Sequence, residues 1–124
     1  MTEAKTVLLV DDDDQLREFC GNVLLACGFQ VHQADNGLEA LLIAAQLRGA
    51  VDLLITDLAM PRINGVELAN AFKTIWPEVN VLYISGSPPE TVEYVLPVHC
   101  AFLTKPFATD ALLKSVENCL EVHA

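Results

Sequence analysis

The stretch from Leu53 to Pro61, LLITDLAMP, constrains the fold of this chain more than any other. Its first four residues are apolar or β-branched, which is typical of a short strand buried on both faces. Asp57 follows where that strand ends, and Pro61 ends regular structure after three more apolar residues. An ionised carboxylate beside so many apolar residues is costly unless other groups pair with it. The identity of the groups that pair with Asp57 is therefore the central question for function.

Composition limits the possible classes of protein. The chain has 124 residues, 52% of them hydrophobic, which suits one domain with a single core and excludes a disordered chain. No apolar run approaches the roughly 20 residues that a membrane span needs, and residues 1–6 lack the pattern of a signal peptide. The formal charge is -10, the wrong sign for a nucleic-acid surface. We therefore expect one cytoplasmic domain, residues 1–124, with no direct nucleic-acid partner and no membrane partner.

The four cysteines form no close pair of the CxxC kind, and each lies among apolar residues. This pattern favours buried free thiols in a reducing compartment over a disulfide framework. The residues concerned are Cys20, Cys27, Cys100 and Cys119.

Strand and helix patterns alternate five times along the chain. Strands are expected over 6–10, 30–34, 53–57, 79–84 and 101–104. Helices are expected over 16–27, from Asn36 to Gly49, from Asn64 to Pro77, weakly over 90–95, and from Thr109 or Asp110 onwards. The apolar positions expected on these helices are Leu16, Phe19, Cys20, Val23, Leu24, Cys27, Leu38, Leu41, Leu42, Ala45, Leu47, Leu68, Ala69, Phe72, Ile75, Leu112, Leu113, Val116, Cys119 and Leu120.

This alternation predicts an α/β fold, a doubly wound five-stranded parallel sheet with helices on both faces. The strands are apolar almost throughout, as strands covered on both faces should be, whereas 30–34 is mixed in polarity and resembles an edge strand. In such sheets ligands bind beyond the carboxyl ends of the strands.

Polar residues stand at four of the predicted strand ends: Asp11 and Asp12, Asp57, Ser85 and Lys105. If the strands are parallel, these groups share one rim. Three neighbouring carboxylates repel one another, and a hard divalent cation such as Mg²⁺ removes that repulsion. A carboxylate nucleophile, a metal, an ammonium and a hydroxyl together suit phosphoryl transfer.

Each of these signals is weak when taken alone. Aspartates after a strand are usually solvated loop residues or helix caps, which is what we expect of Asp13 and Asp14. A Lys-Pro pair is usually a turn. Four groups at four strand ends of one sheet are much harder to attribute to chance, so the functional interpretation is favoured.

The motifs at these strand ends resemble the receiver domain of two-component response regulators, in the family's order and approximate spacing. The resemblance covers nearly the whole chain. It is carried by Val10-Asp11-Asp12, Asp57 with Met60-Pro61 and Gly65, Ser85-Gly86, and Phe102-Leu103-Thr104-Lys105-Pro106-Phe107.

The resemblance implies a flavodoxin-like fold with strand order 2-1-3-4-5. It implies that Asp57 accepts a phosphoryl group from a histidine kinase or histidine phosphotransfer domain, and that Mg²⁺ is the cofactor. Asp12 would bind the metal directly and Asp11 mainly through water, while Asp57 and the backbone carbonyl of Ala59 would complete the protein ligands.

The resemblance also implies a switch that acts on a downstream effector protein or domain. Ser85 would be the switch hydroxyl, Phe102 the switch aromatic, and Lys105 would contact the phosphoryl group. A cis peptide between Lys105 and Pro106 is expected, because Lys105 must leave the strand and turn back over the rim, and because the resemblance implies it. One departure is the segment 87–100, where the family usually has a well-formed fourth helix. Pro97 ends any helix early there, so the fourth helix is expected to be brief, displaced or mobile.

Two other functions remain open. A phosphatase with an aspartyl-phosphate intermediate typically places a second acid two residues after the nucleophile, and here that residue is Ala59. A flavodoxin-type cofactor binder would need a Ser, Thr and Gly-rich loop after the first strand, where this chain has four aspartates. We therefore expect a signalling switch and not an enzyme with turnover.

Overall fold

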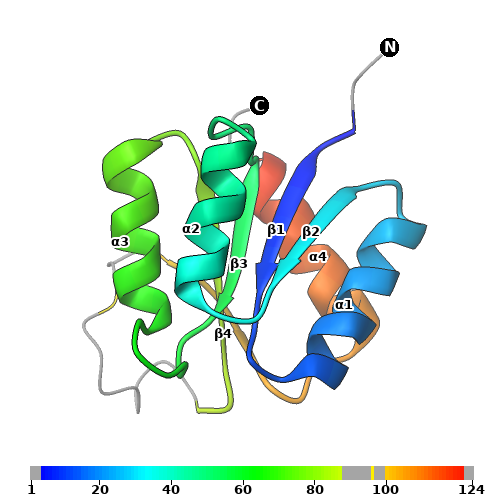
Figure 1. Cartoon of the computed structure of the whole chain (residues 1–124). Coiled ribbons are helices and arrows are strands. Elements are labelled where there is room, and N and C mark those ends of the chain that lie inside the picture. Colours follow the sequence, from blue (N-terminus) through cyan, green and yellow to red (C-terminus); the bar gives the residue numbers. More distant parts are fainter. Residues whose placement is uncertain (1–3, 88–95, 97–99, 122–124) are drawn as a thin grey trace.

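The computed structural model describes residues 4–87, 96 and 100–121. It contains a five-stranded parallel sheet in the order β2-β1-β3-β4-β5, which confirms the predicted architecture and strand order (Figure 1). The strands are β1 (Thr6–Val10), β2 (Gln30–Ala34), β3 (Leu53–Asp57), β4 (Asn80–Ser85) and β5 (Ala101–Thr104). β4 therefore begins and ends one residue later than the sequence pattern predicts.

The described helices are α1 (Asp14–Ala26), α2 (Gly37–Gln46), α3 (Gly65–Ile75) and α4 (Thr109–Glu121). The weak helix predicted over 90–95 lies outside the described residues, as do Pro88, Pro89 and Pro97. None of the helices in the described part of the chain is long and apolar enough to cross a membrane.

The helices cover both faces of the sheet and create two cores. α2 and α3 lie on one face, and α1 and α4 lie on the other (Figure 1). Side chains alternate across a strand, so Leu8 and Val10 of β1 face the first core whereas Val7 and Leu9 face the second. This explains why β1 and β3 are apolar at nearly every position, with Thr6, Thr56 and Asp57 as the exceptions.

Side-chain caps explain where the helices begin. Asn64 and Glu67 form a reciprocal capping box at the start of α3. At the start of α2, Asn36 accepts from the Glu39 backbone N–H, but the Glu39 carboxylate accepts from the Asp35 N–H, so the second capping box is incomplete. Both predicted helix starts are confirmed, because one orphan N–H is satisfied in each case.

The helices contact the sheet through narrower faces than their apolar residues suggest. α2 packs through Gly37, Ala40 and Ala44, whereas Leu38 and Leu42 are 59% and 58% exposed. Small residues allow the helix to approach the sheet closely, and the larger leucines then lie on the outer side. Six of the apolar positions expected on the helices are exposed and do not join the core: Phe19, Cys27, Leu38, Leu42, Ala45 and Ile75.

All four cysteines are free thiols, as the sequence predicts. Cys20 and Cys119 are buried in the core between the sheet and helices α1 and α4. Cys100 is half-buried, and Cys27 is exposed because it is the C-cap residue of α1, outside the packed face of that helix.

Candidate functional site

The parallel sheet brings the predicted site residues to one edge. Asp11 directly follows β1, Asp57 is the last residue of β3, Ser85 is the last residue of β4, and Lys105 directly follows β5. The ends of β1, β3 and β4 lie at the lower edge of the sheet in Figure 1, and β5 runs parallel to β4, so its end lies at the same edge. The register places Asp57 beside Ile84 and Ser85 beside Thr104, so these neighbouring strands end nearly level.

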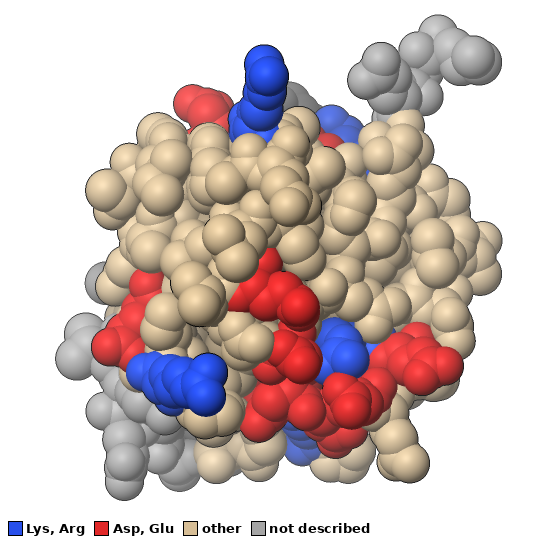
Figure 2. Space-filling model, viewed as in Figure 1, with Lys and Arg blue, Asp and Glu red and all other residues tan. Residues whose placement is uncertain are grey.

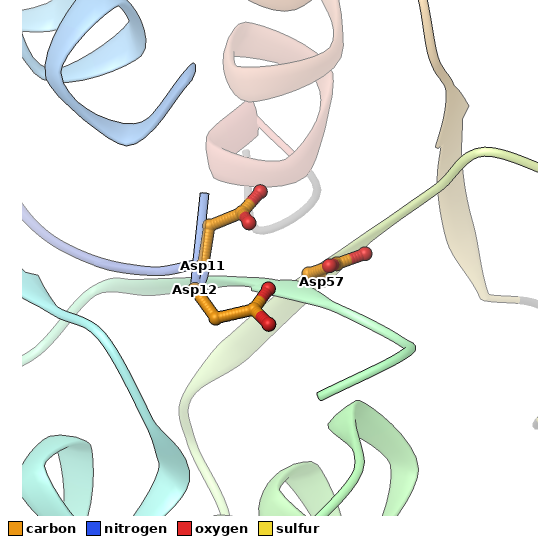
Figure 3. A group of neighbouring side chains, drawn as sticks. All are labelled: Asp11, Asp12 and Asp57. Atoms are coloured by element: carbon orange, nitrogen blue, oxygen red, sulfur yellow. The ribbon is translucent and has the colours of Figure 1, made fainter. Parts of the chain in front are cut away.

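Three carboxylates converge at this edge. Asp11, Asp12 and Asp57 each offer an oxygen within 4.8 Å of the other two. Figure 3 shows the three side chains close together, two from the loop after β1 and one from the end of β3. Asp11 and Asp57 are buried and Asp12 is exposed, so one side of the cluster is shielded from solvent and the other is in contact with it. On the molecular surface, acidic side chains gather around this edge (Figure 2).

Close backbone packing fixes the position of Asp57. The Leu58 N–H donates to the Ile84 carbonyl, and the Gly65 N–H donates to the Leu58 carbonyl. A Cβ added to Gly65 would lie 2.4 Å from the Asp57 carbonyl oxygen and 3.0 Å from the Leu58 Cα. Only glycine lets the start of α3 approach the end of β3 this closely.

Lys105 supplies the positive charge of the site. Its Nζ lies 3.2 Å from Asp11 Oδ2 and 3.5 Å from Asp57 Oδ2. Its backbone N–H donates to the Ser85 carbonyl at 2.7 Å, which ties the end of β5 to β4. The Lys105–Pro106 peptide is cis, which confirms the prediction made from the sequence.

The pKa values of the site reflect repulsion between neighbouring carboxylates and their partial removal from solvent. Burial and then the Asp11 carboxylate raise the pKa of Asp57 from 3.8 to about 6, although Lys105 opposes them. For Lys105, burial lowers the pKa, but the carboxylates of Asp57 and Asp11 outweigh burial and raise it above 10.5. The ammonium therefore stays charged, and it compensates the Asp57 carboxylate only in part.

The donor set fits a hard divalent cation. Asp11 Oδ1 accepts from the Asp13 N–H, but the buried Oδ2 accepts no hydrogen bond of good geometry from the described residues, although it lies in the ion pair with Lys105. A buried carboxylate oxygen of this kind is costly to leave unsatisfied. Oxygen ligands from three carboxylates, with solvent access beside Asp12, are what Mg²⁺ prefers.

The remaining predicted residues lie near the cluster, and their roles stay predictions. Ser85 is buried, and its hydroxyl accepts from the Ser87 N–H at 3.0 Å. Phe102 is half-buried, pairs with Tyr83 in the β4–β5 register, and packs against the core beneath α2 and α3. Ala59 is exposed two residues after Asp57.

Asp13 in the acidic loop and Arg17 in α1 have clear structural roles. Asp13 caps α1 by accepting from the Gln15 and Leu16 N–H groups, which confirms the expectation of a helix cap. Arg17 was not predicted as part of the site, yet its guanidinium donates to the Asp11 carbonyl at 2.7 Å. The only sequence signal for Arg17 is a cation one helical turn after four aspartates.

Comparisons with known proteins agree with this geometry. The family described as "Response regulator receiver domain" matches residues 7–117. The chain is 33% identical over 123 residues to the sensor kinase CckA of Brucella abortus (strain 2308), covering 98% of this chain and 13% of the kinase. It is 30% identical over 118 residues to the response regulator receiver protein CpdR of the same organism, covering 94% of this chain and 97% of that protein.

A solved structure shows the same fold. The chemotaxis response regulator CheY4 of Vibrio cholerae has a TM-score of 0.84 and 31% identity, covering 96% of this chain and all of that one (100%). Relatives therefore include both a protein of nearly this length and a kinase of which this chain spans only 13%.

Proposed function

The chain belongs to the response regulator receiver domain family, and from that premise we propose that it is a switch controlled by phosphorylation of Asp57. Receiver domains are signalling domains of two-component systems, and the proposal concerns how these particular residues carry the signal. The single observation that carries it is the cluster of Asp11, Asp12 and Asp57 beside the Lys105 ammonium at one sheet edge.

Asp57 is the proposed nucleophile. One of its carboxylate oxygens attacks the phosphorus of a phosphohistidine on a histidine kinase or histidine phosphotransfer domain. The new O–P bond forms as the N–P bond breaks, and the electron pair of that bond stays on the donor's nitrogen. The pKa of about 6 leaves Asp57 mostly ionised at pH 7, and burial keeps it poorly solvated and therefore reactive.

Lys105 and the carboxylates supply the electrostatic part of the reaction. The Lys105 ammonium, which already lies 3.5 Å from Asp57 Oδ2, would bind an oxygen of the incoming phosphoryl group. Asp12, Asp57 and the Ala59 carbonyl would hold Mg²⁺ directly, and Asp11 mainly through water. When bound, Mg²⁺ would neutralise charge on the phosphoryl oxygens and bring them toward the anionic nucleophile.

Ser85 and Phe102 are the proposed switch residues. A phosphoryl group on Asp57 adds negative charge and acceptor oxygens, so the Ser85 hydroxyl gains a partner to which it can donate. The hydroxyl oxygen accepts from the Ser87 N–H, and this bond does not use the hydroxyl proton that would be donated. Movement of the β4 end changes the space available to Phe102 on the neighbouring strand, and a downstream effector protein or domain would bind the altered face.

The alternative of a phosphatase has no support in the site. Fast hydrolysis of an aspartyl phosphate needs a base that activates water, and the residue two positions after Asp57 is Ala59. We therefore propose that turnover is limited to slow loss of the phosphoryl group.

Labelling with acetyl phosphate tests the proposal. Intact-mass measurement should show one added phosphoryl group in the presence of Mg²⁺, and the group should be released by hydroxylamine. Asp57→Asn should abolish the labelling, whereas Glu117→Gln, which removes an exposed charge on α4, should leave it unchanged. Equal labelling of Asp57→Asn and the parent would refute the assignment of the nucleophile.

A further inference from the structure

Arg17 lies in the first turns of α1, and its guanidinium reaches back to the loop that carries Asp11 and Asp12. Nη1 donates to the Asp11 carbonyl at 2.7 Å, Nη2 lies 2.8 Å from Asp14 Oδ1, and Nε donates to Gln33 Oε1 at 3.3 Å. The side chain is only 16% exposed, so it is held between these partners.

We propose that Arg17 is a positioning residue for the metal site. It holds the peptide group between Asp11 and Asp12, and so sets how the two carboxylates approach Asp57. This inference rests on the proposed function, because Mg²⁺ is the cation that the site is proposed to bind. Arg17 contacts no ligand atom of that site and acts through the backbone.

The loop after β1 depends on this contact. The Asp11 N–H donates to the Ala34 carbonyl at 3.2 Å, and the Oδ1 of Asp11 accepts from the Asp13 N–H at 2.9 Å. Its carbonyl is held by Arg17, which is anchored in turn to Gln33, the residue before Ala34 in β2. Both sides of Asp11 are therefore tied to the edge strand, and only its Oδ2 is left to face the cluster.

Loss of the Arg17 guanidinium would free the peptide group between Asp11 and Asp12. The Asp11 carbonyl would lose its charged donor, and the following peptide group could then rotate. Asp12 follows that peptide directly and is exposed, so packing does little to hold its carboxylate in place. Mg²⁺ would then have to reorder Asp12 on binding, which lowers affinity.

Electrostatics alone predicts the opposite result. A cation beside a cation site weakens metal binding by repulsion, so removal of the Arg17 charge would tighten the binding of Mg²⁺. A lysine at this position would keep the charge but lose the planar fork that serves three acceptors at once. A positioning role predicts weaker Mg²⁺ binding for both Arg17→Gln and Arg17→Lys. Electrostatic repulsion alone predicts tighter binding for Arg17→Gln and unchanged binding for Arg17→Lys.

Two variants serve as controls, one for loss of the contact with Asp14 and one for loss of a positive charge. The Arg17–Asp14 ion pair is a surface contact, because the Asp14 side chain is 79% exposed, and such pairs contribute little. Asp14→Asn therefore removes one contact of Arg17 without touching the Asp11 carbonyl. Arg48→Gln removes an exposed cation after the end of α2, and so makes the same change in net charge as Arg17→Gln.

Calorimetric titration with Mg²⁺ at pH 7.5 is the test. Arg17→Gln and Arg17→Lys should each bind Mg²⁺ about 10-fold more weakly than the parent. Asp14→Asn and Arg48→Gln should bind it as the parent does. In acetyl phosphate labelling, the Mg²⁺ concentration that gives half the maximal rate should rise in the same proportion, while the rate at saturating Mg²⁺ stays at the parent value. A merely structural role would lower stability in EDTA without moving that concentration.

The inference is overturned if Arg17→Gln binds Mg²⁺ as tightly as the parent or more tightly. It is also overturned if Arg17→Lys behaves as the parent. Should both variants fail to fold, Gln33→Ala removes only the anchor to β2, and unchanged Mg²⁺ affinity in that variant overturns the inference as well. A parent that binds no Mg²⁺ would refute the proposed function itself, which separates the two failures.

Discussion

Replacing Asp57 by asparagine should make the folded chain more stable in the absence of a divalent cation. Folding moves this carboxylate from water to a place beside Asp11, where burial raises its pKa from 3.8 to about 6. At pH 7 the ionised form is therefore disfavoured in the folded state relative to the unfolded state. Asparagine has nearly the same shape and no charge, so it removes this cost.

The magnitude follows from the two pKa values. A change from 3.8 to about 6 corresponds to about 3 kcal/mol. Water reaches the rim beside the exposed Asp12 and screens part of the repulsion, so the expected gain in the free energy of unfolding is roughly 1–3 kcal/mol. Lys105 keeps its ion pair with Asp11 in the variant, so the ammonium is not left alone.

The size of this gain depends on pH, because the two pKa values define a window. Below pH 3.8 Asp57 is protonated in both states, and the variant and the parent should be equally stable. Between pH 4 and pH 6 the unfolded chain loses this proton while the folded chain retains it, so the parent progressively loses stability relative to the variant. The full difference should be present at pH 7.

Urea unfolding in EDTA at pH 4, 5, 6 and 7.5 measures this difference. Glu117→Gln, on the exposed side of α4, makes the same change in net charge and should shift the free energy of unfolding little. Addition of Mg²⁺ should stabilise the parent more than Asp57→Asn, because the variant lacks a ligand. The reasoning would fail if Asp57→Asn were no more stable than the parent at pH 7.5, or if its gain were the same at pH 4.

Three further results are expected. Asp12→Asn should weaken Mg²⁺ binding at least about 10-fold in a calorimetric titration, and unchanged affinity would exclude Asp12 as a ligand. Gly65→Ala should lower the free energy of unfolding by about 1–3 kcal/mol, because its Cβ would lie 2.4 Å from the Asp57 carbonyl oxygen; a neutral effect in urea unfolding would contradict that packing. Beryllofluoride should change hydrogen exchange at residues 85–87 and 100–104 more than in α1, and a parent-like response of Ser85→Ala would contradict the proposed switch.

The position of the site follows from the sequence because strand ends are easy to read. Asp57 ends an apolar run, and the parallel order brings that end level with those of β1, β4 and β5. Alternation of strands and helices forces this order of layers, so local patterns suffice to gather the carboxylates.

The packed faces of the helices do not follow from the sequence in the same way. α2 is apolar on nearly every side, so spacing cannot tell whether Leu38 and Leu42 or Ala40 and Ala44 meet the sheet. The choice depends on how closely the helix can approach, which is a property of the folded layers. Arg17 was missed for a similar reason, because its contact with Gln33 exists only once β2 lies beside β1.

The two halves of the site differ in how firmly they are held, and this difference indicates where a signal can leave it. Asp11 directly follows β1 and Asp57 is the last residue of β3, and both strands are covered on both faces and paired with strands on both sides. Lys105 follows β5, an edge strand of four residues without a fully buried position. Strain created by a phosphoryl group on Asp57 is relieved most cheaply where the least packing is lost. We therefore expect the β4–β5 side, with Ser85 and Phe102, to move. The carboxylates of Asp11 and Asp57 should keep their positions.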